Sequence, residues 1–129
     1  MAYSSLTNGE INLALVDHVL KDLVDQHADI RNLSIDLIKK LTAEYYTLRI
    51  DDLSAKIRTK EIALARQVAM YLARSLTGSS LPKIGAAFGG RDHTTVLHAC
   101  EKIKHELKTK TSLQEAVKAI TAKLKSYSS

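Results

Sequence analysis

The clearest pattern along this chain is a series of apolar stripes at helical spacing, separated by short polar or glycine-containing breaks. Apolar residues three or four positions apart lie on one face of a helix, so each stripe predicts an amphipathic helix. The most regular stripe predicts a helix over residues 61–77. Its members are Ile62, Ala65, Ala69, Leu72 and Leu76. Gly78 follows at the position where a left-handed C-cap commonly ends a helix.

A second stripe, within residues 93–107, predicts the helix that carries the candidate site. Its members are Val96, Cys100, Ile103 and Leu107. The glycines at 89–90 allow a tight turn before this helix, and Asp92 offers a side-chain oxygen to its first free N–H groups. Residues 93–95 then lie in the first turn, where their side chains can project outward while the apolar stripe is held in a core.

The segment from residue 34 to residue 60 is predicted to contain a helix, a short helical turn and a basic loop. Ser34 is a suitable N-cap for a helix that runs to residue 45 or 46. The residues expected on its inner face are Ile38, Leu41 and Tyr45. Residues 51–53 indicate the helical turn, and residues 56–60 alternate basic and other side chains without a helical stripe.

Two more helices complete the predicted bundle. Ser79 or Ser80 opens a short helix with Pro82 in its first turn, where the missing N–H of proline costs nothing. Its expected inner residues are Leu81, Ile84 and Phe88. The last helix is expected to begin with a capping box formed by Ser112 and Glu115. Its expected inner residues are Leu113, Val117, Ile120 and Leu124.

A short helix, a glycine turn and a longer amphipathic helix make a helix-turn-helix. The fold class is therefore predicted to be all-α, a helical bundle that contains a helix-turn-helix with a basic loop. In residues 1–33, Thr7 or Asn8 can cap a helix to about residue 25, and its apolar stripe is wider than a lone surface helix requires. We place a boundary near residues 26–33, so that residues 34–129 form the main domain.

Composition and charge indicate a folded domain and the kind of partner that it could bind. The 129 residues are 45% hydrophobic and 26% charged, which is typical of a folded domain rather than a disordered chain. Residues 1–33 hold two basic and five acidic residues, whereas residues 34–129 hold 17 basic and nine acidic ones. A basic body fits a polyanionic partner such as nucleic acid or an acidic membrane surface, and a merely solvated basic surface is the alternative.

The single cysteine, Cys100, excludes an intrachain disulfide and favours a reducing cytoplasm. Its place on an apolar stripe indicates a core residue rather than a nucleophile. No apolar run is long enough to span a bilayer, and the first residues lack the pattern of a secretion signal.

Catalysis has little support in the sequence. No glycine-rich phosphate loop ending in Lys-Ser or Lys-Thr is present. Glu101 shares a predicted helix face with His98 or His105, but such a pair is typical of a solvated surface rather than of a metal site. We therefore expect no catalytic residue and no metal site.

The polar first turn of the helix that follows the glycines favours DNA binding. Thr94 and Thr95 can place methyl groups on a thymine methyl and hydroxyls on bases or phosphates, and His93 can donate or accept. Arg58 can enter a minor groove. The residues suited to holding phosphates are Arg66, Gln67 and Lys83. Asp92 has two open interpretations, an N-cap alone or a cap that also accepts from a cytosine amino group.

Three runs of residues carry a resemblance to a known family. They are Arg66-Gln67-x-Ala69-Met70-Tyr71-Leu72, Ser80-Leu81-Pro82-x-Ile84-Gly85 and Phe88-Gly89-Gly90-Arg91-Asp92-His93-Thr94-Thr95-Val96-Leu97-His98-Ala99. Together they resemble the C-terminal DNA-binding domain of the bacterial chromosomal replication initiator DnaA, and the last run is a highly specific signature of that family. The resemblance covers residues 34–126. Residues 1–33 look like the end of the family's AAA+ lid with a linker helix.

The resemblance implies sequence-specific binding of double-stranded DNA at DnaA boxes of the replication origin. Asp92, His93 and Thr94 would read bases in the major groove with support from Thr95, and Arg58 would reach into the minor groove. The positions that match the family's contacts on or near the DNA backbone are Lys56, Arg66, Gln67, Arg74, Leu81, Pro82 and Lys83.

The resemblance also implies that this chain needs no cofactor, because ATP or ADP and Mg²⁺ belong to the family's ATPase domain, which the sequence lacks. A monomer in the bacterial cytoplasm, associated with the nucleoid, is expected. Acidic phospholipid or a regulatory protein are further expected partners. The main alternative is a helical protein-interaction or acidic-membrane-surface module without sequence-specific DNA binding, and a small hydrolase or metal protein is the third.

Overall fold

The computed structural model describes residues 34–56 and 59–128, and all regular structure within these ranges is helical. The elements are α2 (Ile35–Tyr45), a 3₁₀ helix η3 (Ile50–Leu53), α3 (Lys60–Thr77), α4 (Leu81–Ala87), α5 (His93–Glu106) and α6 (Thr111–Ser128). The predicted all-α fold class is thereby confirmed. The predicted linker helix of residues 1–33, with its domain boundary, lies outside the described residues, as does Arg58.

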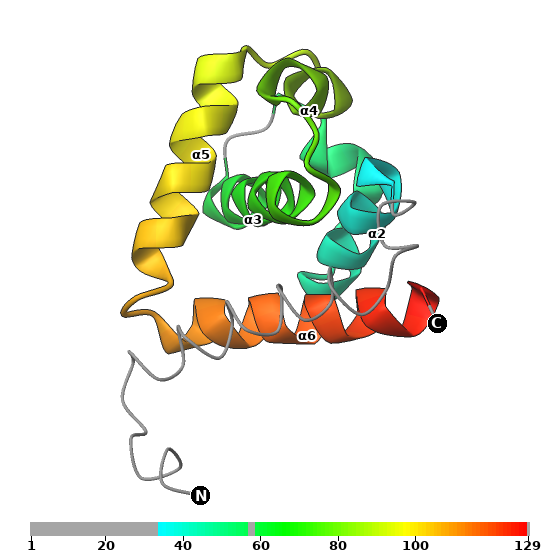
Figure 1. Ribbon diagram of the computed structural model, residues 1–129, viewed down its shortest axis with the longest axis vertical. Helices are drawn as coiled ribbons and strands as arrows, with labels where there is room; N and C mark the ends of the chain where they lie inside the picture. Colours follow the sequence, from blue (N-terminus) through cyan, green and yellow to red (C-terminus); the bar gives the residue numbers. More distant parts are fainter. Residues whose placement is uncertain (1–33, 57–58, 129) are drawn as a thin grey trace, which may run out of the picture.

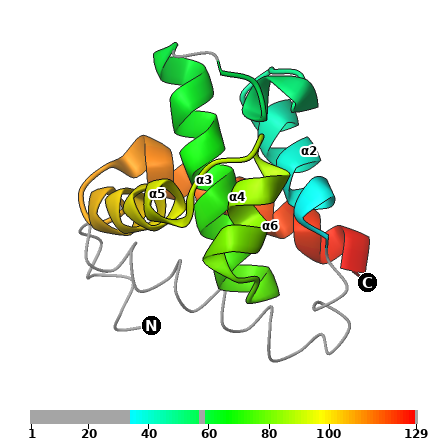
Figure 2. The same cartoon turned by 90° about the horizontal axis from the view of Figure 1, so that it is seen from above.

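The helix α3 lies in the middle of the bundle, with α5 packed on one side of it and α2 on the other (Figures 1 and 2). The short helix α4 packs mainly against the first part of α5, and α6 lies across the far end of the bundle against α2 (Figure 1). The amino-terminal end of α5 and the helix α4 are therefore at the opposite end of the molecule from α6.

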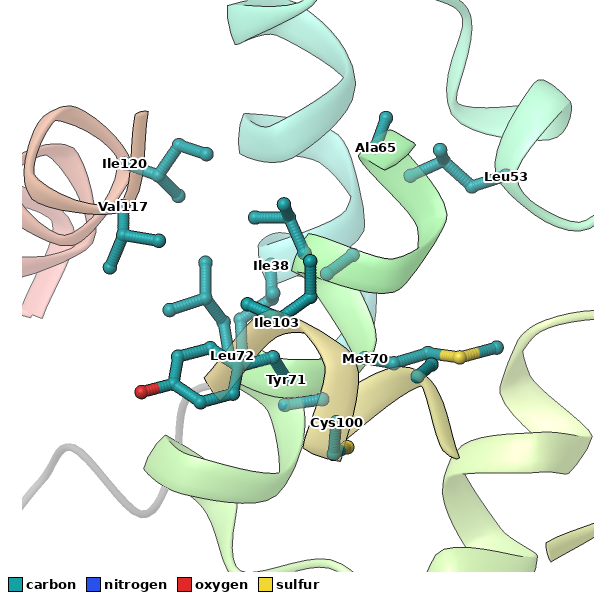
Figure 3. Close-up of a cluster of buried hydrophobic side chains, with 14 of the residues drawn as sticks. Ile38, Leu53, Ala65, Met70, Tyr71, Leu72, Cys100, Ile103, Val117 and Ile120 are labelled. Atoms are coloured by element: carbon teal, nitrogen blue, oxygen red, sulfur yellow. The ribbon is translucent and has the colours of Figure 1, made fainter. Parts of the chain in front are cut away.

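One hydrophobic cluster joins these helices, and Figure 3 shows side chains of α2, α3, α5 and α6 meeting within it. The largest fully buried side chains are Phe88, Ile38, Leu41, Leu53, Met70, Leu72, Ile84, Ile103, Leu107, Ile120 and Leu124. The stripes that predicted the helices 61–77 and 93–107 face this cluster. No described helix is long and apolar enough to cross a membrane.

The prediction that Tyr45 faces inward is wrong. Its side chain is 44% exposed and meets Tyr46 edge-on, with ring centroids 5.1 Å apart. Tyr45 is the last residue of α2, and there it borders a hollow between α2 and α6 instead of packing in the core.

Most helix starts follow the predicted caps. The hydroxyls of Ser34 and of Ser80, the second of the two serines predicted as alternatives, accept from the N–H groups three residues later, at 3.0 and 3.3 Å. The expected capping box of the last helix is wrong, because α6 begins at Thr111 and Ser112 lies inside its first turn. The carbonyl of Lys110 already accepts the N–H of Gln114 at 3.1 Å, so the helical hydrogen bonds start before the predicted cap.

The boundaries of α3 differ from the prediction by a single residue. The helix begins at Lys60 because the hydroxyl of Thr59 caps it, accepting the N–H of Ile62 at 3.4 Å. It ends at Thr77, and the φ of 67° at Gly78 confirms the predicted left-handed C-cap.

Candidate nucleic-acid interface

Three hydrogen bonds to one backbone carbonyl group stabilise the turn between α4 and α5. The oxygen of Gly85 accepts from the N–H groups of Phe88, Gly90 and Arg91, at 3.2, 3.0 and 2.9 Å. A Cβ at Gly85 would overlap the carbonyl oxygen of Arg91, so only glycine lets the turn fold this closely onto α4. The tight turn fixes the direction in which α5 leaves α4.

The carboxylate of Asp92 caps α5 and accepts the N–H of Thr95 at 2.8 Å. This backbone hydrogen bond is the main reason that the pKa of Asp92 lies below its ordinary value, with a smaller contribution from the charge of His93. The carboxylate is therefore ionised at neutral pH. The side chains of Asp92, His93, Thr94 and Thr95 are all exposed, and we call these four residues the tip of α5.

The later turns of α5 are anchored in the core. Val96 and Ile103 are fully buried, and the predicted core position of Cys100 is confirmed by its exposure of 7%. Burial raises the pKa of the Cys100 thiol, so the thiolate is disfavoured. Leu97 is 39% exposed and extends the outer surface beyond Thr94. The buried apolar residues of α5 therefore hold its exposed polar tip in a fixed position.

The segment leading into the basic loop is tied to the same turn. The Nη2 group of Arg91 donates to the carbonyl oxygen of Ala55 at 2.9 Å. Lys56 follows immediately and is exposed. Arg91 belongs to the signature run, but the sequence alone does not reveal its role, because its partner lies 36 positions earlier in the chain.

The two arginines of α3 among the predicted backbone contacts, Arg66 and Arg74, have different surroundings. Arg66 is partly buried, and its pKa is lowered first by burial and second by the charge of Arg91. Arg74, in contrast, borders a hollow lined by Cys100 and Lys104, beside the second half of α5 rather than near its tip.

The other predicted backbone contacts are accessible as well. Gln67 is partly exposed, one position after Arg66 on α3. In the first turn of α4, Pro82 and Lys83 are exposed and Leu81 is partly buried against the core. Within the described residues, no three His, Cys, Asp or Glu side chains are grouped closely enough to hold a metal ion.

A comparison with known protein families bears on this arrangement. The model of the family described as the bacterial dnaA protein helix-turn-helix matches residues 35–103. This is more than half of the 129 residues, from the first residue of α2 to the last turns of α5. The match therefore includes the turn, the tip of α5 and the segment before the basic loop, and it ends before α6.

Proposed function

This chain belongs to the helix-turn-helix family of bacterial DnaA proteins, and on that premise we propose that it reads DnaA boxes of the replication origin through the tip of α5. The family resemblance inferred from the signature run is thereby confirmed. The role of this domain family is DNA binding in replication initiation, and the domain is not catalytic. The finer proposal concerns which sequence is bound and which side chains read it.

The observation that carries the proposal is a polar, exposed helix end on a buried apolar underside. An α-helix fits the major groove of B-DNA, where each base pair presents a distinct pattern of donors, acceptors and methyl groups. The methyl group of Thr94 suits a thymine methyl, and the imidazole of His93 can donate to or accept from a base edge. Asp92 caps α5, and its ionised oxygens can also accept from a cytosine amino group.

The remaining contacts of the proposal hold the duplex in register. Arg58 enters the minor groove of the box. The backbone contacts are Lys56, Arg66, Gln67, Arg74, Leu81, Pro82 and Lys83. Support for them comes from the exposure of Lys56 and Lys83. Arg74 would reach phosphates that flank the second half of α5.

The proposal extends to the rest of the protein's behaviour. Residues 1–33 would be the end of an AAA+ lid with a linker helix, and ATP with Mg²⁺ would act only in that ATPase domain. The described domain would bind a box as a monomer and without nucleotide. Its location would be the bacterial cytoplasm, at the nucleoid, with acidic phospholipid or a regulatory protein as further partners.

The affinity for a box duplex and for a scrambled duplex, measured over a salt series, tests the proposed function. We expect a clear preference for the box at every salt concentration. With the four proposed backbone cations, affinity should fall roughly 100-fold between 50 and 200 mM salt, because cations on phosphates release counterions. Equal affinity for the two duplexes would contradict the proposal and favour a module that recognises acidic surfaces in general.

Substitution of Lys83 by alanine tests whether this side chain contacts a phosphate or reads a base. Because a phosphate contact carries no sequence information, affinity for both duplexes should fall by the same factor, and the salt slope should decrease by about 1. Lys118→Ala is the matched control, since Lys118 is exposed on α6 at the opposite end of the bundle. A change in the ratio of the two affinities for Lys83→Ala would show that Lys83 reads bases instead.

A further inference from the structure

A buried lysine lies behind the candidate interface. Lys39 of α2 is only 7% exposed. Its ammonium group donates to the hydroxyl of Ser54 and to the carbonyl oxygen of Ala87, both at 2.6 Å, and lies 5.1 Å from the ring centroid of Phe88. One side chain thereby connects α2, the residue that follows η3 and the last residue of α4.

Stability alone does not require a lysine at this position. Removing an ammonium group from water is costly, and the partners of Lys39 among the described residues are a hydroxyl, a carbonyl and an aromatic ring, none of which carries a formal charge. An apolar side chain of similar length would fill the same space without that cost. The ammonium group instead fixes the positions of the two oxygens that accept its hydrogen bonds, because charge-assisted hydrogen bonds are short and strong.

Other contacts hold the same two segments together. The hydroxyl of Ser54 also approaches the carbonyl oxygen of Ala87, at 3.4 Å. Arg91 donates to the carbonyl oxygen of Ala55. Gly89 lies so close to this segment that a Cβ at its position would overlap the carbonyl oxygen of Ser54. We call this set of contacts the loop junction. It joins the residues just before Lys56 to both ends of the turn that leads into the tip of α5.

We propose that Lys39 is a positioning residue for DNA recognition, which fixes Ser54–Lys56 relative to the tip of α5. The inference rests on the proposed function, since it assigns a role in the binding of the box. Two elements that contact one duplex bind more tightly when their separation is set in advance, because less conformational freedom is lost on binding. Lys39 never touches DNA in this arrangement and acts through the segment that it holds.

The test compares Lys39→Met with Lys40→Met in binding of the box duplex. Both changes remove one positive charge from adjacent positions of α2, but Lys40 is exposed and belongs to no part of the loop junction. We expect Lys39→Met to lower the affinity about tenfold and the salt slope by about 1, as loss of one phosphate contact would. Lys40→Met should leave the salt slope unchanged, and both variants should retain the thermal transition of the parent protein.

A double-mutant cycle with Lys56→Ala identifies the route of the effect. If Lys39 acts through the segment that ends at Lys56, the double variant should lose less affinity than the product of the two single losses. Ser54→Ala removes one acceptor of the ammonium group with little change in volume, and it should reproduce the loss of salt slope even if Lys39→Met unfolds the chain.

The outcomes separate the inference from the proposed function. If Lys39→Met and Ser54→Ala bind the box as tightly as Lys40→Met does, or if the cycle is additive, Lys39 has no positioning role. In that case a retained preference of the parent protein for the box would leave the proposed function standing. If the parent protein itself shows no preference for the box, the proposed function fails, and the inference fails with it.

Discussion

Substitution of His93 or Thr94 by alanine is expected to remove most of the preference for a box duplex over a scrambled one. Each side chain that reads a base edge contributes about 1–3 kcal/mol of discrimination, which corresponds to a loss of preference of about fivefold to 140-fold. Weaker general binding should remain, because the proposed backbone contacts are untouched. The measurement is the ratio of the affinities for the two duplexes, determined for each variant at one salt concentration.

A matched control comes from the same helix. His105 is exposed in the last turn of α5, about 18 Å from His93 along the helix axis. His105→Ala should leave the preference for the box intact. All three side chains are exposed, so the thermal transitions of the variants should stay close to that of the parent protein. Full preference in the His93 variant would mean that the recognition turn has been assigned wrongly.

Gly89→Ala is expected to be among the most destabilising single changes in the turn. Gly89 and its neighbour Gly90 both have positive φ, at 89° and 78°. Alanine at either position costs about 1–2 kcal/mol of backbone strain. At Gly89 the new Cβ would also overlap the carbonyl oxygen of Ser54, whereas at Gly90 nothing lies within 4 Å. Overpacking of this kind should add about 1–3 kcal/mol.

The difference between the two alanine variants isolates the contact with Ser54, because the backbone strain is common to both. The free energy of unfolding, measured with a chemical denaturant, should be lower for Gly89→Ala than for Gly90→Ala by that additional amount. Equal losses of stability in the two variants would show that the turn does not pack against Ser54 as the structure describes.

The sequence predicted those parts of the fold that depend on local chemistry. The stripe around Leu72 and the one around Ile103 gave the two central helices, because a period of 3.6 residues requires only neighbours along the chain. Asp92 is recognisable as a cap for the same reason, and Ser80 as one of two candidate caps with Ser79. The error at Tyr45 arose because a stripe gives the direction of a side chain but not how closely a neighbouring helix packs against it, and Tyr45 borders a hollow between α2 and α6.

The loop junction could not be predicted from the sequence. Lys39, Ser54 and Ala87 are widely separated along the chain and meet only because α2 and α4 pack around α3. A lysine beside the apolar residue Ile38 looks like an ordinary solvated residue until its surroundings are known. Arg91 was visible within the signature run, but its partner Ala55 was not. Non-local contacts of this kind need the tertiary structure.

The central claim is that the tip of α5 reads base edges in the major groove. The most direct test is the affinity for a box duplex in which uracil replaces thymine and 7-deazapurines replace purines. These changes remove methyl groups and acceptors from the major groove alone and leave base pairing and the minor groove unaltered. We predict that the modified box loses most of its preference over a scrambled duplex, and undiminished affinity for the modified box would contradict the account.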